Sequence, residues 1–489
     1  MFATGTLLIA ILILLLILRI IKWKTNKLPP GPFSWPVYGS LSLLRRLTRE
    51  LGGQHLAFLE LSKRYNSNVI SLQLGSSKIV VVSGTAVHTV LKGEEYDGRP
   101  WNEFIKMRNL GKKHGITMND GQEWKELRGW MVRTLKTCGF GTQTMSDMIK
   151  DEVMVVLDNL KDGGVRRLKP LITPAVINVL WCLATGKRFC EGKRLQYFID
   201  LMERRTKVFD MVGGVLSTFP WIRYIAPEAS GYNLLVGLNN ELKAFLMESI
   251  VEHKEKYMMG SEADAIDMFL REMFTIKDSN SIFNEEQLVM VLIDLFLAGT
   301  TTTGITLDFM FINMVVHQDV QRKLQQEIDS MIPSDRLPTI EDKAKLPYTE
   351  AVMSEMLRMW PTFPVIGPRR VLRDTILEGY SIPKESTILI NLYSVNMDPN
   401  VHPAPHKFQP ERYLKNGVYE PIPDVIYFGK GRRRCPGEVL ARSSLFLIFV
   451  SVMQRFTLLP VPGKGPTTIE IDAGLSISPK PYEVLVVPR

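Results

Sequence analysis

Cysteine is scarce in this sequence. Only four cysteines occur among 489 residues: Cys138, Cys182, Cys190 and Cys435. So few cannot build the disulfide framework of a small secreted domain, and they fit a reducing compartment better. Cys182 falls within a helical period, and we assign it to core packing.

Acidic residues are fewer than basic ones. They number 51 against 60 lysines and arginines, which leaves a net charge of +9. This balance suggests an acidic protein partner or an anionic membrane surface, and it is too modest and dispersed to indicate nucleic-acid binding. Repeats of fixed period are also missing. Apolar residues make up 45%, which supports a sizeable core and argues against disorder.

Charge is missing altogether from residues 2–18, which are mostly Leu and Ile. As a helix at about 1.5 Å per residue they span roughly 25 Å, close to the hydrocarbon thickness of a bilayer. The alternative is a cleaved signal peptide, but no basic residue precedes the run and no small-x-small cleavage site follows. Lys22, Lys24 and Lys27 follow instead, which places the main body in the cytoplasm.

Three parts of the chain are therefore expected. Residues 1–21 are a transmembrane signal anchor, residues 22–33 are a basic and proline-rich hinge, and residues 34–489 are the globular catalytic domain. The hinge contains Leu28-Pro29-Pro30-Gly31-Pro32. Its prolines favour an extended connector and cannot continue the anchor helix.

Helix dominates the rest of the pattern, and strands are few and short. Residues 96–120 are irregular and glycine-rich, so we expect a long functional loop there. A hairpin is predicted for residues 69–82 about Gly75, with short strands near Ile376 and at residues 387–392. Helices are predicted at residues 54–66, 85–91, 122–135, 144–160, 170–186, 195–213, 231–257, 285–317 and 349–359.

A short cationic loop holds the fourth cysteine. It reads Phe428-Gly-Lys-Gly-Arg-Arg-Arg-Cys435-Pro-Gly437. Its glycines permit positive φ and the close approach of a flat ligand. A helix is expected to begin near Pro436, and its N-terminus together with three arginines favours a thiolate at Cys435. Such a thiolate is a ligand or a nucleophile, and the loop alone does not decide between them.

The predicted helix 285–317 is the longest, and it is apolar on most sides, so it should be buried. Its middle holds two glycines and four threonines between Gly299 and Gly304, which are poor helix formers. Threonine hydroxyls can bond back to a carbonyl one turn earlier and bend a helix. The segment is either a gap over which a ligand sits or a bent packing helix with small residues at a crossing.

Two pairs of residues share helix faces. Trp124 and Arg128 are four apart, which fits a functional pair or a surface arginine packed on a tryptophan. Glu355 and Arg358 are three apart beside apolar neighbours, which implies partial burial and a need for further partners. Arg412 is available to complete this network.

Residues 428–437 resemble the haem-binding signature of the cytochrome P450 family, in the pattern Phe428-x-x-Gly431-x-Arg433-x-Cys435-x-Gly437. Other segments match this family in the expected order. They are Trp124-x-x-x-Arg128, the threonine-bearing helix, Glu355-x-x-Arg358 and Phe408-x-Pro410-Glu411-Arg412. The resemblance covers residues 28–489 and, through the anchor and hinge, the microsomal members. It implies a mainly α fold, with roughly a dozen helices around a haem, small β-sheets and an N-terminal transmembrane helix.

The resemblance implies haem b (iron protoporphyrin IX) as cofactor, with Cys435 as the axial thiolate ligand of the iron. Gly431 and Gly437 would keep the loop tight, and Phe428 would pack beside the cysteine. The propionate ligands would be Trp124, Arg128, Arg369 and Arg433, since arginine suits carboxylates. Glu355, Arg358 and Arg412 would form a structural network behind the loop.

Thr302 matches the threonine that relays protons during oxygen activation, and Ala298 and Gly299 would make room for dioxygen and substrate. The position before this threonine is usually Asp or Glu in the family, and here it is Thr301. Asp294 lies two turns earlier, too far to replace the acid simply. An apolar substrate pocket is expected, lined by Phe296, Phe363, Val365 and Ile366, with the region 205–217 and the turn at Leu475.

The implied activity is that of a membrane-anchored monooxygenase that inserts one oxygen atom of O2 into a small lipophilic molecule by hydroxylation, epoxidation or N-oxidation. Electrons would come from NADPH through NADPH–cytochrome P450 reductase, with cytochrome b5 as a second partner, at the endoplasmic reticulum membrane. Lys125, Arg133, Lys136, Lys430, Arg432 and Arg434 would form a basic docking surface for the reductase.

Several alternatives stay open. Residues 97–100, 115–120 and 138–141 are similar to arthropod microsomal members, which include enzymes of sesquiterpenoid hormone epoxidation and of aromatic amino-acid or aldoxime oxidation. A second hypothesis is a reductase-independent haem-thiolate isomerase or dehydratase. Thr301 gives it limited support, because an altered proton path matters less in such an enzyme. A non-catalytic haem-based sensor is a third, and the oxygen-activation helix argues against it.

Overall fold

The computed structural model describes residues 27–75, 77–189, 192–208, 212, 214–276, 281–474 and 476–489. The expected anchor at residues 1–21 lies outside the described residues, as do Cys190 and Leu475. The chain divides into two compact units. The smaller one comprises the chain up to Pro100, Val365–Val395 and Lys430–Arg433, and the larger one comprises Trp101–Pro364, Asn396–Gly429 and Arg434–Arg489.

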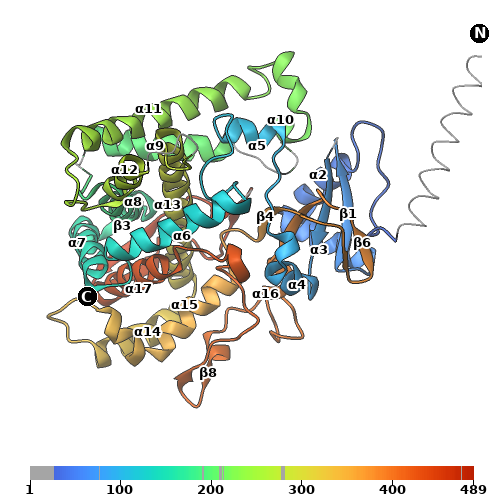
Figure 1. The fold of residues 1–489 in the computed structure, drawn as a ribbon. Coiled ribbons are helices and arrows are strands. Elements are labelled where there is room, and N and C mark those ends of the chain that lie inside the picture. Colours follow the sequence, from blue (N-terminus) through green and yellow to red (C-terminus); the bar gives the residue numbers. More distant parts are fainter. Residues whose placement is uncertain are drawn as a thin grey trace, which may run out of the picture. The chain divides into compact units, whose positions relative to one another are not determined.

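The smaller unit is built on a four-stranded sheet in the order β1-β2-β7-β4, drawn in blue and orange in Figure 1. The predicted hairpin is confirmed, because β1 (Val69–Leu74) and β2 (Ser77–Val82) pair antiparallel with Leu74 opposite Ser77. β7 (Thr387–Asn391) runs parallel to β2, and β4 (Val365–Arg370) runs antiparallel to β7. The unit also contains α2 (Leu41–Leu51), α3 (Gln54–Arg64), α4 (Ala86–Lys92), η1 (Glu94–Tyr96), α16 (Tyr393–Asn396, whose last residue falls in the larger unit) and the pair β5 (Thr375–Leu377) and β6 (Tyr380–Ile382).

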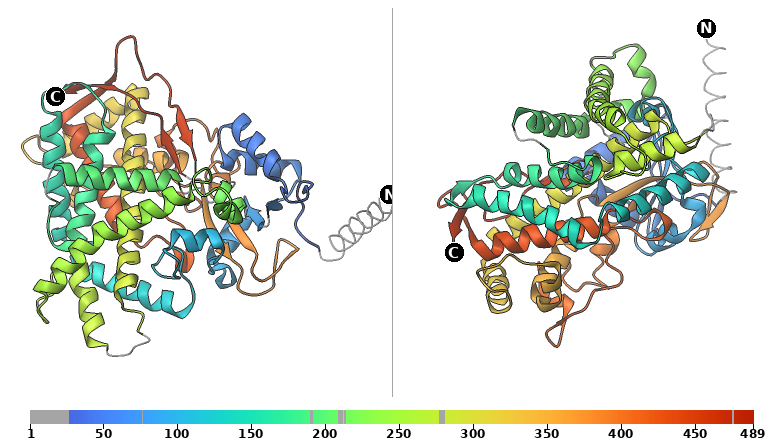
Figure 2. Two further views of the ribbon diagram at one scale, coloured as in Figure 1. Left: turned by 90° about the horizontal axis from the view of Figure 1, so that it is seen from above. Right: turned by 60° about the vertical axis from the view of Figure 1, so that its left-hand side comes forward.

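The larger unit is mainly helical, which agrees with the predicted fold class. Figure 2 shows its helices from two further sides. Its helices are α5 (Glu103–Arg108), α6 (Gly121–Thr137), α7 (Gln143–Leu160), α8 (Lys169–Thr185), α9 (Lys193–Val208), α10 (Val215–Thr218), η2 (Pro220–Tyr224), α11 (Tyr232–Lys256), α12 (Ala265–Thr275), α13 (Glu285–Val316), α14 (Gln318–Met331), η3 (Ile340–Lys345), α15 (Pro347–Met359), η4 (Pro410–Tyr413) and α17 (Glu438–Arg455).

Short strands complete this unit. β13 (Val484–Pro488) pairs with both β10 (Phe456–Pro460) and β3 (Gly164–Arg166). Two further pairs are β11 (Ile471–Ala473) with β12 (Ile477–Pro479), and β8 (Leu414–Lys415) with β9 (Val418–Tyr419). The 3-10 turn η5 (Gly431–Arg433) belongs to the smaller unit.

Helix α13 is the centre of the larger unit, and its predicted burial is confirmed. It packs against α8, α11, α15 and α17, and most of its side chains are buried. It is the one helix among the described residues that is long and apolar enough to cross a membrane. Because 67% of its most apolar window is buried inside the protein, its composition is explained by packing in the core.

One predicted loop contains a helix, and the longest predicted helix is confirmed through its threonine segment. The loop predicted at residues 96–120 contains the helix α5, whose six residues are too few to give a visible period; Asn102 begins it by accepting the Ile105 N–H at 2.9 Å. The threonine segment does not interrupt α13. The Thr302 hydroxyl donates to the Ala298 carbonyl at 2.6 Å, and the α-helix continues through it. A helix with poor formers persists here because tertiary packing outweighs intrinsic propensity.

Candidate functional site

The thiol of Cys435 lies at the beginning of α17. Gly437 is the residue that precedes this helix, and a Cβ added there would lie 3.9 Å from the Cys435 sulfur. The Cys435 N–H donates to the Phe428 carbonyl at 2.8 Å, which folds the loop back on itself. The cysteine is exposed, so its sulfur is accessible to a ligand.

The surroundings of Cys435 act on its pKa in both directions. Surrounding protein desolvates the sulfur and raises its pKa above the ordinary value, and Glu438 adds to this effect. The Gly437 N–H, Arg128 and Arg434 lower the pKa, but they do not outweigh burial. The helix N-terminus and the arginines thus favour the thiolate in the predicted direction, and desolvation opposes them. A metal ion deprotonates a coordinating thiol outright, so this thiol fits a metal ligand better than a free nucleophile.

Trp124 and Arg128 share one face of α6, as predicted. The Arg128 guanidinium lies 5.7 Å from the Trp124 ring centroid, within cation–π range. It also donates from Nη2 to the Arg434 carbonyl at 2.5 Å, next to Cys435. Trp124 is buried and Arg128 is half-buried. The pair thus fixes an arginine beside the cysteine loop.

In the smaller unit, Asp97 binds three arginines. Its carboxylate accepts from Arg369 at 2.8 Å and from Arg432 at 3.0 Å, and its backbone carbonyl accepts from Arg433 Nε at 2.9 Å. Sequence reasoning missed Asp97, because its partners lie more than 270 residues away and leave no local signal. Asp97 orients Arg369 and Arg433, the two predicted propionate ligands of this unit.

Gly431 is required by its surroundings. Its φ is +71°, and a Cβ there would lie 2.4 Å from the Leu91 carbonyl oxygen. Any side chain would collide with backbone that cannot move aside. The close approach of the Leu91 carbonyl thus gives a physical reason for glycine at position 431 of this loop.

Two cations of the predicted docking surface are paired with carboxylates of the protein itself. Arg432 forms ion pairs with Glu94 at 2.5 Å and Asp97 at 3.0 Å. Arg434 pairs with Glu438 at 2.6 Å. Because their charges are matched locally, these arginines are poorer sites for an acidic partner than their sequence positions suggested.

Several residues in the middle of α13 are exposed or half-buried, whereas those on both sides are buried. Ala298 is exposed and Thr302 is half-buried. Residues three or four apart on a helix share a face, so Leu295, Ala298 and Thr302 form one partly exposed face of α13. The structure thus brings two of the predicted catalytic residues together.

Two predicted residues point elsewhere. Phe296 is 1% exposed and packs with Trp181 and Phe198, at ring-centroid distances of 5.4 and 5.2 Å. It belongs to the aromatic core, because positions two apart on a helix lie about 200° apart and Phe296 cannot share the face of Ala298. A Cβ on Gly299 would lie 2.7 Å from Leu180 Cδ1 of α8, so helix packing explains this glycine rather than space for a ligand.

The other predicted pocket residues are half-buried. Val365 and Ile366 begin β4, opposite Asn391 and Ile390 of β7. Phe363 precedes them in the larger unit and is also half-buried. All three keep accessible apolar surface.

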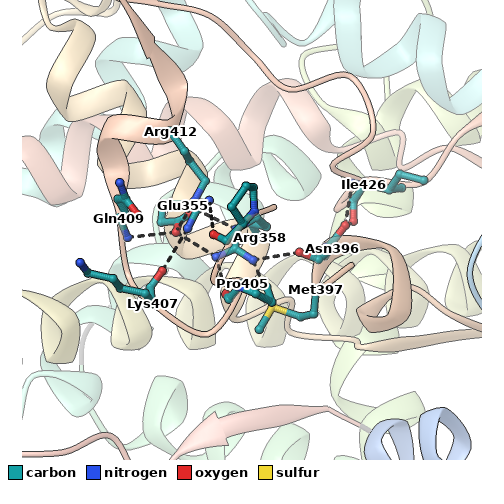
Figure 3. A network of polar contacts seen from close by, with 10 residues as sticks. Glu355, Arg358, Asn396, Met397, Pro405, Lys407, Gln409, Arg412 and Ile426 are labelled. Carbon is teal, nitrogen blue, oxygen red and sulfur yellow. Dashed lines mark hydrogen bonds and ion pairs between the residues drawn. The ribbon is translucent and has the colours of Figure 1, made fainter. Parts of the chain in front are cut away.

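Glu355, Arg358 and Arg412 form a buried network (Figure 3). Arg358 donates to both oxygens of Glu355, from Nε at 2.7 Å and from Nη2 at 2.9 Å, and neither residue is exposed. Arg412 Nε donates to Glu355 at 2.9 Å, and so does the Gln409 N–H at 3.0 Å. Arg358 also reaches the carbonyls of Asn396 and Pro405. This bidentate geometry with every group satisfied is what a buried ion pair needs.

Asp294 is unavailable as a proton carrier. Its two carboxylate oxygens accept from Arg108 at 2.9 Å and from the N–H groups of Ile116 and Thr117 at 2.8 Å each. It is 4% exposed. It therefore anchors the loop 108–117 to α13 and does not replace the acid missing at Thr301.

Comparison with known proteins agrees with this donor set. The family model of cytochrome P450 matches residues 29–486. The chain is 36% identical to the probable cytochrome P450 305a1 of Drosophila melanogaster, over 95% of each chain. It is 37% identical to the farnesoate epoxidase of Bombyx mori, over 94% of each chain, and 32% identical to cytochrome P450 2J1 of Oryctolagus cuniculus, over 95% of this chain and 92% of that protein.

An accessible thiol at a helix N-terminus, arginines held beside it and a partly exposed face of α13 fit a haem held by one thiolate. The match extends over nearly the whole chain and includes the segments that carry these residues. The chain therefore belongs to the cytochrome P450 family, whose members are monooxygenases that bind haem b through a cysteine thiolate.

Proposed function

We propose that this protein is a membrane-anchored monooxygenase of the endoplasmic reticulum, with its catalytic domain in the cytoplasm. It takes electrons from NADPH through NADPH–cytochrome P450 reductase, with cytochrome b5 as a second donor, and inserts one oxygen atom into a small lipophilic substrate. The observation that carries this proposal is the accessible Cys435 thiol at the start of α17, in the same unit as the partly exposed face of α13 at Ala298 and Thr302.

Several residues hold the cofactor in this proposal. When bound, haem b supplies the metal centre at which dioxygen is activated and oxygen transfer occurs. Cys435 would bind the haem iron through its sulfur, and Gly431 and Gly437 would keep its loop tight beside Phe428. Trp124, Arg128, Arg369 and Arg433 bind the haem carboxylates through charge-assisted hydrogen bonds. Glu355, Arg358 and Arg412 stabilise the fold around this loop and so retain the haem.

Thr302 positions protons in this proposal. Its hydroxyl hydrogen points at the Ala298 carbonyl, 2.6 Å away, so its lone pairs are free to accept from a water beside this face of α13. Thr301 carries no ionisable group and cannot supply the proton that an acid would. Protons then reach the site through a water that the Thr302 hydroxyl holds in place by accepting its hydrogen bond.

The substrate is lipophilic in this proposal, because Phe363, Val365 and Ile366 offer apolar surface and a membrane anchor gives access to lipids. Among the alternatives, epoxidation of a sesquiterpenoid is favoured by the 37% identity to a protein described as a farnesoate epoxidase. Oxidation of an aromatic amino acid or aldoxime is the second candidate, with less support.

Reconstitution of the holoenzyme with reductase in phospholipid vesicles tests the proposal. With a sesquiterpenoid acid or ester as substrate, we expect NADPH-dependent product that carries one atom from isotopically labelled O2. Omitting the reductase should abolish turnover. Product formed at the full rate without NADPH and reductase would instead establish a reductase-independent isomerase or dehydratase.

Replacing Thr302 by Ala is expected to uncouple the reaction. Loss of a positioned proton-transfer group typically costs on the order of 10²-fold, so product formed per NADPH should fall by about that factor. NADPH consumption and product are measured together. Thr303→Ala is the matched control, because Thr303 is adjacent, buried and turned about 100° away on the helix. Unchanged coupling in Thr302→Ala would remove this residue from the proton path.

A further inference from the structure

A buried arginine in the larger unit has no carboxylate partner among the described residues. Arg205 of α9 is 2% exposed. Its Nε donates to Asn239 Oδ1 of α11 at 2.8 Å, and its Nη2 donates to the Arg108 backbone carbonyl at 3.1 Å. Both acceptors are neutral, and they accept from Nε and Nη2, not from Nη1. Arginine is almost never buried to this degree unless it is paired.

The nearest carboxylate is already committed. Asp294 is bound by Arg108 at 2.9 Å and by two backbone N–H groups at 2.8 Å. Arg108 is itself 6% exposed and also donates to Asn109. The cluster of Arg108, Arg205 and Asp294 thus holds two positive charges and one negative charge in a buried environment.

Electrostatics around Arg205 reflect this imbalance. Burial and, to a smaller extent, Arg108 lower the pKa of its guanidinium to about 9, and Asp294 only partly offsets them. A second anion beside Arg205 would relieve the imbalance, because an opposite charge favours the charged form.

The cluster lies along the same side of α13 as the partly exposed face. Asp294, Ala298 and Thr302 are four residues apart in succession, so they follow one another along one broad face. At about 1.5 Å per residue, Asp294 is about 6 Å from Ala298 and about 12 Å from Thr302 along the helix axis. Apolar side chains pack together around α5, the helix that also carries Arg108: Phe104, Ile105, Met118, Leu216 and Leu235.

We propose that Arg205, supported by Arg108, binds the carboxylate of a lipophilic substrate whose oxidised carbon lies over Ala298 and Thr302, about 6–12 Å along α13 from Asp294. The apolar side chains take up the chain of the substrate, and the arginine fixes its polar end, which sets the position of oxidation. This inference rests on the proposed monooxygenase function. It makes Arg205 a specificity-determining residue, since arginine recognises carboxylates through paired hydrogen bonds.

A purely structural role for Arg205 makes a different prediction. Its bonds to Asn239 and to the Arg108 carbonyl could serve only to join α9, α11 and α5. Such a clamp would support the binding of acids and esters alike. A carboxylate site would distinguish an acid from its own methyl ester.

The test is a titration of the full-length holoenzyme at neutral pH with fatty acids from octanoic to hexadecanoic acid and with their methyl esters. Binding is measured by the shift in haem spin state and by the ligand-dependent rise in stability to urea. For at least one chain length, we expect the acid to bind tighter than its ester by about tenfold or more. Arg205→Met should remove this preference while ester affinity stays within about threefold, and Arg205→Lys should keep part of it.

Arg204 supplies the matched control. It is the adjacent residue on α9, its side chain is 45% exposed, and it lies 3.5 Å from Asp200. Arg204→Met should leave the preference for acids unchanged.

Two results would overturn the proposal. One is that no acid in the series binds tighter than its ester to the wild-type protein. The other is that Arg205→Met weakens acids and esters equally, which leaves only the clamp. If Arg205→Met does not fold, the wild-type comparison and Arg205→Lys decide. Failure of the proposed function is separate, because it appears as missing reductase-dependent product while the urea measurement still reports acid binding.

Discussion

Glu355→Gln is expected to destabilise the protein by about 3–5 kcal/mol, the usual cost of removing one partner from a buried ion pair. The two arginines that now bind Glu355, Arg358 and Arg412, would keep their charges in a site with no exposure for Arg358. Stabilities of native proteins are about 5–15 kcal/mol, so this loss removes a large share. Urea unfolding and haem content of the purified protein would measure it.

An exposed ion pair of the same unit is the control. Lys323 and Glu411 lie 3.0 Å apart with side chains 55% and 42% exposed. Lys323→Gln should change the unfolding free energy by less than about 1 kcal/mol, because solvent screens such pairs. A cost for Glu355→Gln as small as that of the control would show that the network of Figure 3 contributes little to stability.

Cys435→Ala is expected to abolish monooxygenase turnover and the thiolate-type Soret band of the reduced carbon monoxide complex. The substitution removes the one sulfur that lies at the start of α17, and no hydroxyl or ring nitrogen takes its place. Thiolate donation favours O–O cleavage, so a haem retained without it would lack the chemistry. The spectrum and the labelled-oxygen assay are the two measurements.

The other described cysteines provide controls of the same chemistry. Cys138 and Cys182 are half-buried, and burial raises the pKa of each thiol to about 11. Their replacement by Ala should leave the Soret band in place. Survival of that band in Cys435→Ala would mean that another residue ligates the iron.

Features that depend on neighbours in the chain were predictable. The period of apolar residues located α3, α6, α7, α8, α11 and α13 to within a few residues, because a helix face is defined by positions three and four apart. The hairpin of β1 and β2 followed from short β-branched runs about Gly75. The pairing of Glu355 with Arg358 is likewise local, since they are three apart.

The sequence analysis predicted no helix at α2, α12 or α14, which have 11, 11 and 14 residues, and none at the short α5. α5 has only six residues, and one and a half turns are too short for apolar residues to show a helical period. The desolvation that raises the pKa of Cys435 was also not predictable, because the sequence shows the charges near this cysteine but not its burial.

The sequence by itself determined the family, the loop that presents Cys435 and the helix that bears Thr302, because each rests on a short contiguous pattern. Only the tertiary structure decided which side chains meet: Asp97 with Arg369 and Arg433, Gly299 with Leu180, and Arg205 with no carboxylate among the described residues. The physical reason is that these contacts join residues many turns apart. Packing of whole helices fixes them, and no local periodicity records which faces will touch.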